Sequence, residues 1–261
     1  MADAGVHVRI DEGVAGPVAV VTVDNERRLN CLTTPVILEL TAAFAELSKD
    51  ARLRAVLLTG AGSRAFIGGA DLNELAALDP DSARAFITRL HQACQAIRDC
   101  PVPVIGRIGG FCLGGGLEIA ASCDFRAAAE GAQFGMPEVL MGIPSVIEAA
   151  LLPGLIGWGR TREMLLTGAL YSAAEAAAIG LVQKVVPAPE LEPAVAAWVD
   201  AICRATPAAI RAQKALMRRW EEVSVSEGIL ASIDAFSKSY ATGEPRAAIG
   251  AFLAAKREKK S

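Results

Sequence analysis

Histidine is scarce in this chain of 261 residues, which contains only His7 and His91. Zinc hydrolases and enzymes with a Ser-His-Asp triad both depend on histidine, so the sequence argues against these two classes and predicts no metal site. The chain also has no GxSxG, Walker A or HExxH motif. His91 lies in a run with helical periodicity beside Leu90, and we interpret it as a residue at the surface or the boundary of the core.

A strong charge imbalance and targeting signals are also missing. The formal net charge is only −3, so we expect neither a nucleic acid nor a membrane as partner. The first residues lack the basic and apolar regions of a signal peptide. Arg107 and Glu118 interrupt the most apolar window, 103–121, which argues against a membrane span. Six cysteines without CxxC spacing, set among apolar neighbours, indicate reduced core thiols in a cytoplasmic protein.

What the chain does have is apolar residues, which make up 52% of it and are enough for a sizeable core. Apolar runs bounded by turn residues predict strands, the first two forming a hairpin, at 6–10, 17–23, 53–59, 101–108, 124–128 and 181–186. After Pro187 only helical patterns remain, at about 190–204, 207–221, 226–241 and 245–258. We therefore predict an α/β core over residues 1–187 and an all-helical region over 188–261.

Local signals mark several helix ends. The run Thr33-Thr34-Pro35 predicts an N-cap and a proline at the first helical position, before apolar residues at helical spacing. Short helices are expected from about Asp71 and Gly114, and a longer one over 81–98. Ser172 and Glu175 have the spacing of a capping box, and Gly180 is suited to end that helix.

Three segments combine glycine with acidic residues: Ala65-Phe-Ile-Gly-Gly-Ala-Asp71, Gly109-Gly-Phe-Cys-Leu-Gly-Gly-Gly-Leu-Glu118 and Gln133-Phe-Gly-Met-Pro-Glu138. Taken singly, each has an ordinary explanation. Glycine clusters are usually turns, and a glutamate in a first helical turn or in solvent needs no function. Glu118 and Glu138 are, by number alone, two of 29 acidic residues.

The two glycine-rich segments share a layout, because each follows an apolar strand and leads into a predicted helix. The first N–H groups of such a helix have no intrahelical partner. Two of these turns brought together could offer two N–H donors to one oxygen, which is an oxyanion hole. Glu118 would lie within reach of the same site, where two carboxylates can divide the roles of general acid and general base.

In this order and spacing, the segments resemble the crotonase superfamily, whose best-known members are the enoyl-CoA hydratases. The resemblance covers nearly the whole chain, from Val18-Ala-Val-Val-Thr-Val through Leu166-Thr-Gly168 to Ala251-Phe-Leu. It implies the crotonase (ClpP-like) α/β fold, a spiral of ββα units with a C-terminal helical trimerisation region. The assembly implied is a homotrimer or a dimer of trimers.

The resemblance assigns roles to four residues. Ala70 and Gly115 would supply the two oxyanion N–H groups, and Glu118 and Glu138 match both catalytic glutamates of the hydratases. In that mechanism the N–H groups bind the thioester oxygen, and the glutamates hold a water that adds to Cβ while Cα is protonated. No metal and no separate cofactor is implied, because coenzyme A is part of the acyl-CoA substrate.

The resemblance also implies a coenzyme A site. The loop that meets the adenine and phosphate end would contain Arg27, Arg28 and Leu29, although a solvated loop explains the two arginines equally well. The remaining matches are the backbone contacts and a C-terminal aromatic that in some members reaches a neighbouring subunit's ligand: Gly68, Ala70, Leu72 and Gly115, and Phe252.

One stretch departs from the family pattern. Where a typical hydratase has a glycine-rich run after the second glutamate, this chain reads Met141-Gly-Ile-Pro-Ser-Val-Ile-Glu-Ala-Ala-Leu-Leu152. In one interpretation the helix starts a residue earlier and packs Val146 and Ile147 in the core. In the other, residues from Ser145 to Glu148 reshape the acyl pocket for shorter or polar substrates, with Glu148 as a third polar group.

The function implied is an enoyl-CoA hydratase, a carbon–oxygen lyase that adds water to a trans-2-enoyl-CoA. The alternatives are a Δ3–Δ2 enoyl-CoA isomerase, a specialised (carnitinyl-CoA-like) 3-hydroxyacyl-CoA dehydratase of the same superfamily, and a non-catalytic binding member. Isomerases of the family commonly keep only the glutamate that matches Glu138, so the presence of Glu118 favours hydration. The negative net charge and the intact pair argue against a binding protein.

Overall fold

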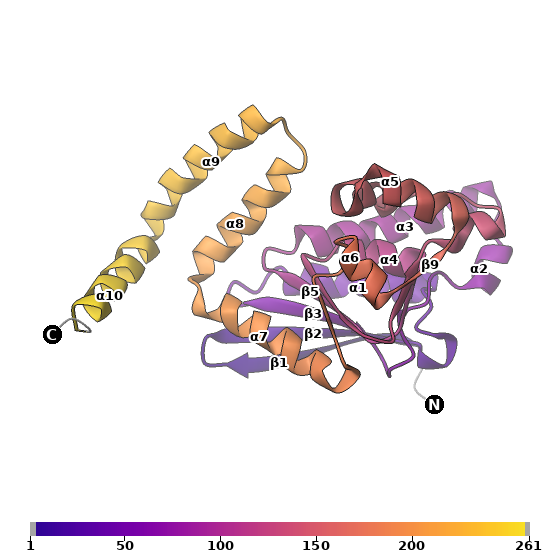
Figure 1. Cartoon of the computed structure of the whole chain (residues 1–261), viewed down its shortest axis with the longest axis horizontal. Helices are drawn as coiled ribbons and strands as arrows, with labels where there is room; N and C mark the ends of the chain where they lie inside the picture. The colour runs from indigo at the N-terminus through magenta and orange to yellow at the C-terminus, as the bar shows by residue number, and fades with distance from the viewer. Residues whose placement is uncertain (1–3, 259–261) are drawn as a thin grey trace. The chain divides into compact units, whose positions relative to one another are not determined.

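The computed structural model describes residues 4–258 and divides into two compact units, with the division between Val199 and Asp200. The described strands all lie in the first unit, and the second unit is helical (Figure 1). The division between the units falls inside helix α7 (Leu191–Arg204). The boundary predicted after residue 187 lies earlier in the chain, directly after the last strand. No helix within residues 4–258 is long and apolar enough to cross a membrane.

Two sheets make up the framework of the first unit. The larger sheet has the order β1 (Gly5–Gly13), β2 (Gly16–Asp24), β3 (Ala55–Gly60), β5 (Val104–Ile108), β7 (Phe125–Ala129) and β10 (Lys184–Val186). Its first pair is the predicted antiparallel hairpin, and the other pairs are parallel. The smaller sheet has the order β4 (Ala65–Ile67), β6 (Phe111–Leu113), β8 (Gln133–Gly135) and β9 (Leu170–Ser172).

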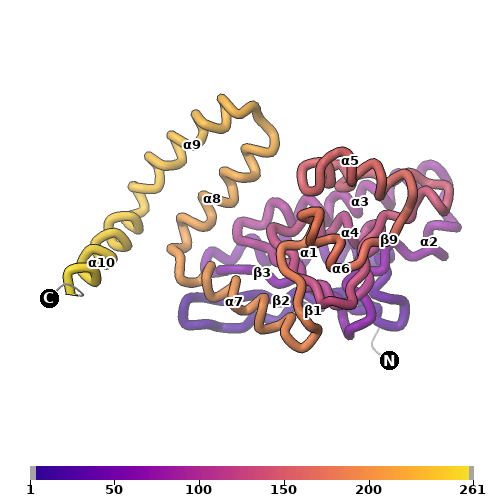
Figure 2. The backbone as a smooth tube through the Cα atoms, viewed as in Figure 1, coloured from indigo at the N-terminus to yellow at the C-terminus, as the bar shows by residue number. Residues whose placement is uncertain are grey.

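The chain passes repeatedly from the larger sheet to the smaller one and then into a helical segment. The three repeats are β3–β4 before α2 (Leu72–Ala76) and α3 (Pro80–Asp99), β5–β6 before α4 (Gly115–Ala121), and β7–β8 before the 3₁₀ helix η2 (Pro137–Met141). Figure 2 traces this path as a continuous tube. The predicted spiral of ββα units is confirmed. Because every repeat crosses from the second sheet into a helix, all three predicted site segments lie at equivalent junctions.

The core confirms the helical periodicity read from the sequence. Helix α1 (Thr34–Leu47) buries Val36, Ile37, Leu40, Phe44 and Leu47. It packs against α3, whose buried face includes Leu90 and Ile97. Strand β3 is buried along its whole length, as expected for a strand with parallel neighbours on both sides.

Helix ends agree with the predictions except at α1. Ser172 and Glu175 form the predicted capping box of α6 (Ala173–Ala178), and Gly180 follows with φ 87°. Thr33 is the N-cap of α1 but its side chain makes no cap bond, and Pro35 is the second helical residue rather than the first. The Thr34 N–H donates instead to Glu74 Oε2 of α2, at 2.9 Å. A carboxylate distant in sequence thus does what a local cap was expected to do.

The remaining helices are α5 (Leu152–Thr167), α8 (Pro207–Trp220), α9 (Val225–Ser239) and α10 (Glu244–Glu258). With α7, the last three confirm the four predicted helices of the C-terminal region. All six cysteines are free thiols, as expected. Four of them are buried, whereas Cys31 and Cys203 are partly exposed, so the prediction that every cysteine lies in the core is wrong for these two.

Candidate active site

The first glycine-rich turn leaves one backbone N–H free of the sheet. Leu32 forms an isolated parallel bridge with Ala70, in which the Leu32 N–H donates to Gly69 O at 2.8 Å and the Asp71 N–H donates to Leu32 O at 2.9 Å. Backbone groups alternate in direction along an extended segment, so the Ala70 N–H points away from Leu32. This is the orientation that a donor to an external oxygen requires.

The second glycine-rich turn also leaves a backbone N–H without a partner, because a helix begins there. Gly114 is the N-cap of α4, with φ 52° and ψ −125°, a conformation open to glycine and strained for other residues. Its carbonyl accepts from Leu117 and Glu118, at 2.8 and 3.1 Å. Gly115 is the first residue of the helix, and its N–H therefore has no acceptor within the helix.

These two turns touch one another. A Cβ on Gly69 would lie 3.3 Å from the carbonyl oxygen of Leu113, and a Cβ on Gly116 would overlap the carbonyl oxygen of Ile67. Only glycine allows the two backbones to come this close. Ala70 follows Gly69, and Gly115 lies between Leu113 and Gly116, so both residues lie beside these contacts.

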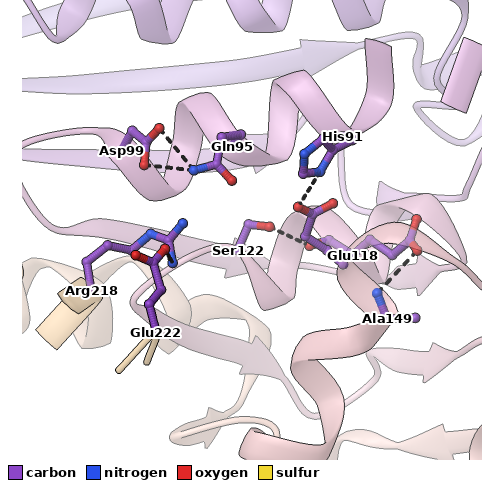
Figure 3. Close-up of polar contacts among 9 residues, drawn as sticks. His91, Gln95, Asp99, Glu118, Ser122, Ala149, Arg218 and Glu222 are labelled. Carbon is purple, nitrogen blue, oxygen red and sulfur yellow. Dashed lines mark hydrogen bonds and ion pairs between the residues drawn. The ribbon is translucent and has the colours of Figure 1, made fainter. Parts of the chain in front are cut away.

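Glu118 lies in the first turn of α4 and is only 4% exposed. Its Oε1 accepts a hydrogen bond from the Ala149 N–H at 3.3 Å, and its backbone carbonyl accepts one from the Ser122 hydroxyl at 2.9 Å (Figure 3). Burial, together with the negative charges of Glu138 and Glu148, raises the pKa of Glu118 to about 8, and the Ala149 N–H opposes this rise. Its surroundings therefore favour the acid form of the Glu118 carboxyl.

Glu138 lies in η2, and the structure brings it next to Glu118. A Cβ on Gly114 would overlap Glu138 Oε1, so this carboxyl rests against the residue that caps the helix of Glu118. Its Oε2 accepts from the Ser145 hydroxyl at 2.9 Å. Burial raises the pKa of Glu138, while its own backbone N–H and the Ser145 hydroxyl oppose the rise. Burial thus raises the pKa of both carboxyls, and at Glu138 two hydrogen bonds oppose the rise.

The predicted coenzyme A loop is joined to the first turn. Arg28 Nη1 lies 2.8 Å from Asp71 Oδ2, and the Gly68 N–H donates to the carbonyl oxygen of Leu29 at 2.8 Å. Leu29 has φ 56°, in the left-handed region, which turns the chain back at this point. Asp71 also accepts from the first N–H groups of α2 as its N-cap. The loop and the Ala70 turn are therefore one connected structure.

Three further predicted residues are exposed. Arg27 lies in the 3₁₀ helix η1 (Glu26–Arg28), and Leu72, the first residue of α2, is 59% exposed. Phe252 is 69% exposed on α10, in the second unit. Its part in a ligand site stays a prediction.

Of the two expectations for the departure after Glu138, core packing is correct only in part, and the reshaped acyl pocket stays a prediction. Val146 is 40% exposed, so its predicted place in the core is wrong, while Ile147 does pack against the core. The helical segment begins as the 3₁₀ helix η3 (Ile147–Leu151), and Ile147 has φ 36°. The bend at Ile147 turns Val146 outward and Glu148 inward.

Glu148 has a partner that the sequence did not reveal. It is 3% exposed, and its Oε1 lies 2.8 Å from Nδ1 of His91 on α3. The two residues are far apart in sequence, so no spacing rule connects them. The one available signal was a single acid in the apolar run from Val146 to Leu152, because a buried carboxylate needs a partner.

Within the part of the chain that the structure describes, no three His, Cys, Asp or Glu side chains are grouped so that they could hold a metal ion. The polar groups of the site are two carboxyls and backbone N–H groups. Such an arrangement can stabilise negative charge on a carbonyl oxygen and move protons beside it.

Sequence comparison agrees with the fold and the motifs. The profile of the family described as Enoyl-CoA hydratase/isomerase matches residues 13–260. The chain is 34% identical to the Short-chain-enoyl-CoA hydratase of Clostridium acetobutylicum, over 91% of this chain and 92% of that protein. It is also 34% identical to the Crotonyl-CoA hydratase of Syntrophomonas wolfei, over 90% and 91%.

Solved structures give the same result. An enoyl-CoA hydratase from Bacillus anthracis superposes with a TM-score of 0.89 at 32% identity, covering 94% of this chain and 95% of that one. One from Mycobacterium smegmatis superposes with a TM-score of 0.90 at 28% identity, with the same coverage. With the family profile matched over nearly its whole length, this chain belongs to the enoyl-CoA hydratase/isomerase family, the crotonase superfamily that its motifs predict.

Proposed function

We propose that this protein is an enoyl-CoA hydratase, which adds water reversibly across the double bond of a trans-2-enoyl-CoA. The observation that carries the proposal is the proximity of two carboxyls, Glu118 and Glu138, at the start of the helix that Gly115 opens. Relatives named as hydratases, at about a third identity over nine-tenths of the chain, support the same activity.

In the proposed reaction the N–H groups of Ala70 and Gly115 bind the thioester oxygen. A conjugated thioester accepts a nucleophile at Cβ only when negative charge can move onto that oxygen. Two fixed donors stabilise this charge at little reorganisation cost, and loss of one such donor typically lowers the rate about 10²–10³-fold. No metal and no separate cofactor enters the proposed reaction, since the thioester itself provides the electron sink.

The two glutamates accept and donate the protons of the reaction. The oxygen of a water molecule bonds to Cβ while an ionised carboxyl takes one of its protons, and a protonated carboxyl delivers a proton to Cα. The pair must therefore enter the reaction with one proton between them. Burial raises the pKa of both carboxyls, that of Glu118 to about 8, and a backbone N–H and Ser145 oppose the rise at Glu138, so we place the proton of the free protein on Glu118. Return of a proton from Glu138 to Glu118 completes the cycle.

The coenzyme A portion would lie along the loop of Arg27, Arg28 and Leu29 and the backbone of the Ala70 turn. Arg28 is held by Asp71, and about half of its side chain stays exposed, which leaves donors for a phosphate. Gly68 lets its backbone pack closely against Leu29 of this loop, and Leu72 is exposed. Gly115 completes the set from the second turn.

We also propose that the protein acts as a homotrimer or a dimer of trimers in the cytoplasm. The C-terminal helices expose more large apolar side chains than a monomer in water normally would. The exposed apolar side chains include Ile229, Leu230, Ile233, Phe236, Phe252 and Leu253. Sedimentation equilibrium would test the assembly, since a monomer at all concentrations would contradict it.

The activity is tested by following the loss of the conjugated-thioester absorbance when the purified protein is mixed with crotonyl-CoA. We expect turnover by the wild type and little by Glu118→Gln or Glu138→Gln. A protein that instead shifts the double bond of a 3-enoyl-CoA would be an isomerase of the same family. One that binds acyl-CoA without turning over either substrate would be a binding member, or a dehydratase with a different acyl group.

A further inference from the structure

One buried carboxylate lies directly beside the proposed oxyanion donor. The side chain of Asp71, the residue after Ala70, is only 5% exposed. Its Oδ1 accepts the N–H groups of Asn73 and Glu74, at 3.0 and 3.1 Å, and so caps α2. Its Oδ2 lies 2.8 Å from Nη1 of Arg28, whose side chain is 48% exposed. The cap therefore accounts for one carboxylate oxygen, and the ion pair accounts for the other.

The segment that follows the coenzyme A loop holds the backbone on both sides of Ala70. The Leu32 N–H donates to the carbonyl oxygen of Gly69 at 2.8 Å, and the Asp71 N–H donates to that of Leu32 at 2.9 Å. The Gly69 carbonyl and the Ala70 N–H belong to one planar peptide group. The bond from Leu32 therefore fixes the direction in which the Ala70 N–H points.

Two residues of the coenzyme A loop have left-handed backbone. Leu29 and Asn30 both have φ 56°. Asparagine tolerates this conformation, and the buried Asn30 side chain donates to two backbone carbonyl oxygens, at 2.9 Å each. For leucine the conformation costs roughly 1–3 kcal/mol and persists only where surrounding contacts maintain it. Leu29 lies between Asn30 and Arg28, so its neighbours anchor it from both sides, through the buried amide and through the ion pair.

Phosphate binding and helix capping do not by themselves explain the pairing of Asp71 with Arg28. An arginine that serves only a phosphate has no need of a carboxylate, which occupies part of its guanidinium and offsets its charge. An aspartate that serves only as a cap has no need of a cation, since asparagine caps a helix equally well. A buried carboxylate is also costly to keep. The ion pair therefore has a further role, which is to join the loop to the Ala70 turn.

We propose that Asp71 and Arg28 are positioning residues for the Ala70 N–H: their ion pair holds the coenzyme A loop against the Ala70 turn, so that the coenzyme A portion and the thioester oxygen bind to one fixed frame. Binding of the distant part of the substrate then supports the stabilisation of charge at the reacting carbonyl. The inference rests on the proposed function, since the direction of this N–H matters only if it binds the thioester oxygen.

The test compares two substrates in Asp71→Asn. Asparagine keeps an oxygen for the cap and loses the negative charge that pairs with Arg28. Crotonyl-pantetheine lacks the adenosine and phosphate groups of crotonyl-CoA, so it does not report on phosphate binding. We expect kcat to fall about 10- to 100-fold on both substrates, less than the 10²–10³-fold typical for loss of a whole oxyanion donor. A raised KM for crotonyl-CoA with unchanged turnover of crotonyl-pantetheine would overturn the proposal.

A spectroscopic measurement tests the oxyanion contact without turnover. The dye-like ligand para-dimethylaminocinnamoyl-CoA absorbs at longer wavelength when its carbonyl oxygen accepts strong hydrogen bonds, because these draw electron density along the conjugated system. At saturating ligand, we expect the red shift on binding to be smaller in Asp71→Asn than in the wild type. An equal red shift in the two proteins would contradict a positioning role.

Asp11→Asn is the matched control. It breaks an exposed ion pair of similar length on β1, in which Arg9 lies 2.9 Å from Asp11, and it should leave both kcat values and the red shift unchanged. If Asp71→Asn does not fold, the double variant Arg28→Gln/Asp71→Asn leaves no unpaired charge and should show the same losses on crotonyl-pantetheine. Failure of both variants to fold would overturn the proposal, since the pair would then serve stability alone.

The proposed function and this inference fail separately. If the wild type does not hydrate crotonyl-CoA, the proposed function is wrong, but the red shift still decides whether the pair orients the Ala70 N–H. If the wild type is active and Asp71→Asn matches it on both substrates, only the positioning role is lost. A wild type that gives no red shift would overturn the inference whatever its activity.

Discussion

Glu118 and Glu138 lie side by side, yet the protein holds them by different means. Glu118 is 4% exposed on a helix whose Gly116 packs directly on the backbone of Ile67, so its surroundings are closely packed. Glu138 is partly exposed in a 3₁₀ turn and relies on the hydroxyl of Ser145. The contrast teaches that different degrees of burial, together with hydrogen bonds to one carboxyl, can separate the pKa values of two neighbouring glutamates.

The largest effect should come from removing either carboxyl. We expect Glu118→Gln and Glu138→Gln each to lower kcat by about 10²–10⁴-fold, because each removes an acid–base group without changing its size. Stopped-flow or steady-state assays with crotonyl-CoA measure this directly. Unchanged coenzyme A binding in both variants is the control, and wild-type turnover by either would remove that glutamate from the mechanism.

The close contact between the helix of Glu118 and the Ile67 backbone can be tested by a substitution at Gly116. A Cβ at this position would overlap Ile67 O, so Gly116→Ala should lower the free energy of unfolding by about 1–3 kcal/mol. Denaturant titration gives the value. Gly154→Ala in α5 is the matched control, since its Cβ would meet nothing within 4 Å and stability should stay within about 0.5 kcal/mol. Equal stability of the two variants would contradict the close packing of the turns.

The difference in protonation predicts the shape of the pH profile. The raised pKa of Glu118 means that its acid form is present below about pH 8 and is lost above it. We expect kcat/KM to fall about tenfold for each pH unit above that value, and to fall again at acid pH as Glu138 becomes protonated. Circular dichroism at each pH separates this loss from unfolding. A flat profile through pH 9 would mean that Glu118 does not act as an acid.

Ser145 gives the smallest and most selective test. Ser145→Ala removes a hydrogen bond to the ionised form, so the pKa of Glu138 should rise further and the acid limb should move up by about one pH unit. The rate at neutral pH should fall by about tenfold or less. Ser145→Thr keeps the hydroxyl and should behave like the wild type. An equal movement of the alkaline limb would show that the two carboxyls are not held independently.

The helices were the most predictable part of the fold. Periodic apolar residues in α1 and α3 and in the four C-terminal helices gave the right elements, since amphipathic periodicity is local and is carried by every turn. The smaller sheet was missed. Its strands have three residues each, and three of the four lie within the segments 65–71, 109–118 and 133–138, where pairing with distant strands outweighs local preference.

The candidate site, too, could be predicted only where its sequence pattern is local. Its residue types and order could be read from the motifs, including the Gly114–Glu118 junction, because a strand followed by glycine and a helix start is a local pattern. His91 and Glu148 could not be paired from the sequence, since 57 residues separate them. The outward turn of Val146 was equally hidden, because it follows from one left-handed residue, Ile147, that no composition rule predicts.

By itself, then, the sequence determined the strands of the larger sheet, the C-terminal helices and the family. Tertiary structure alone decided that Glu118 is buried with a raised pKa, that Ser145 donates to Glu138, and that Glu148 pairs with His91. The physical reason is that the pKa of a group depends on its burial and on the groups that lie near it in space. The separation of residues along the chain does not predict which groups these are.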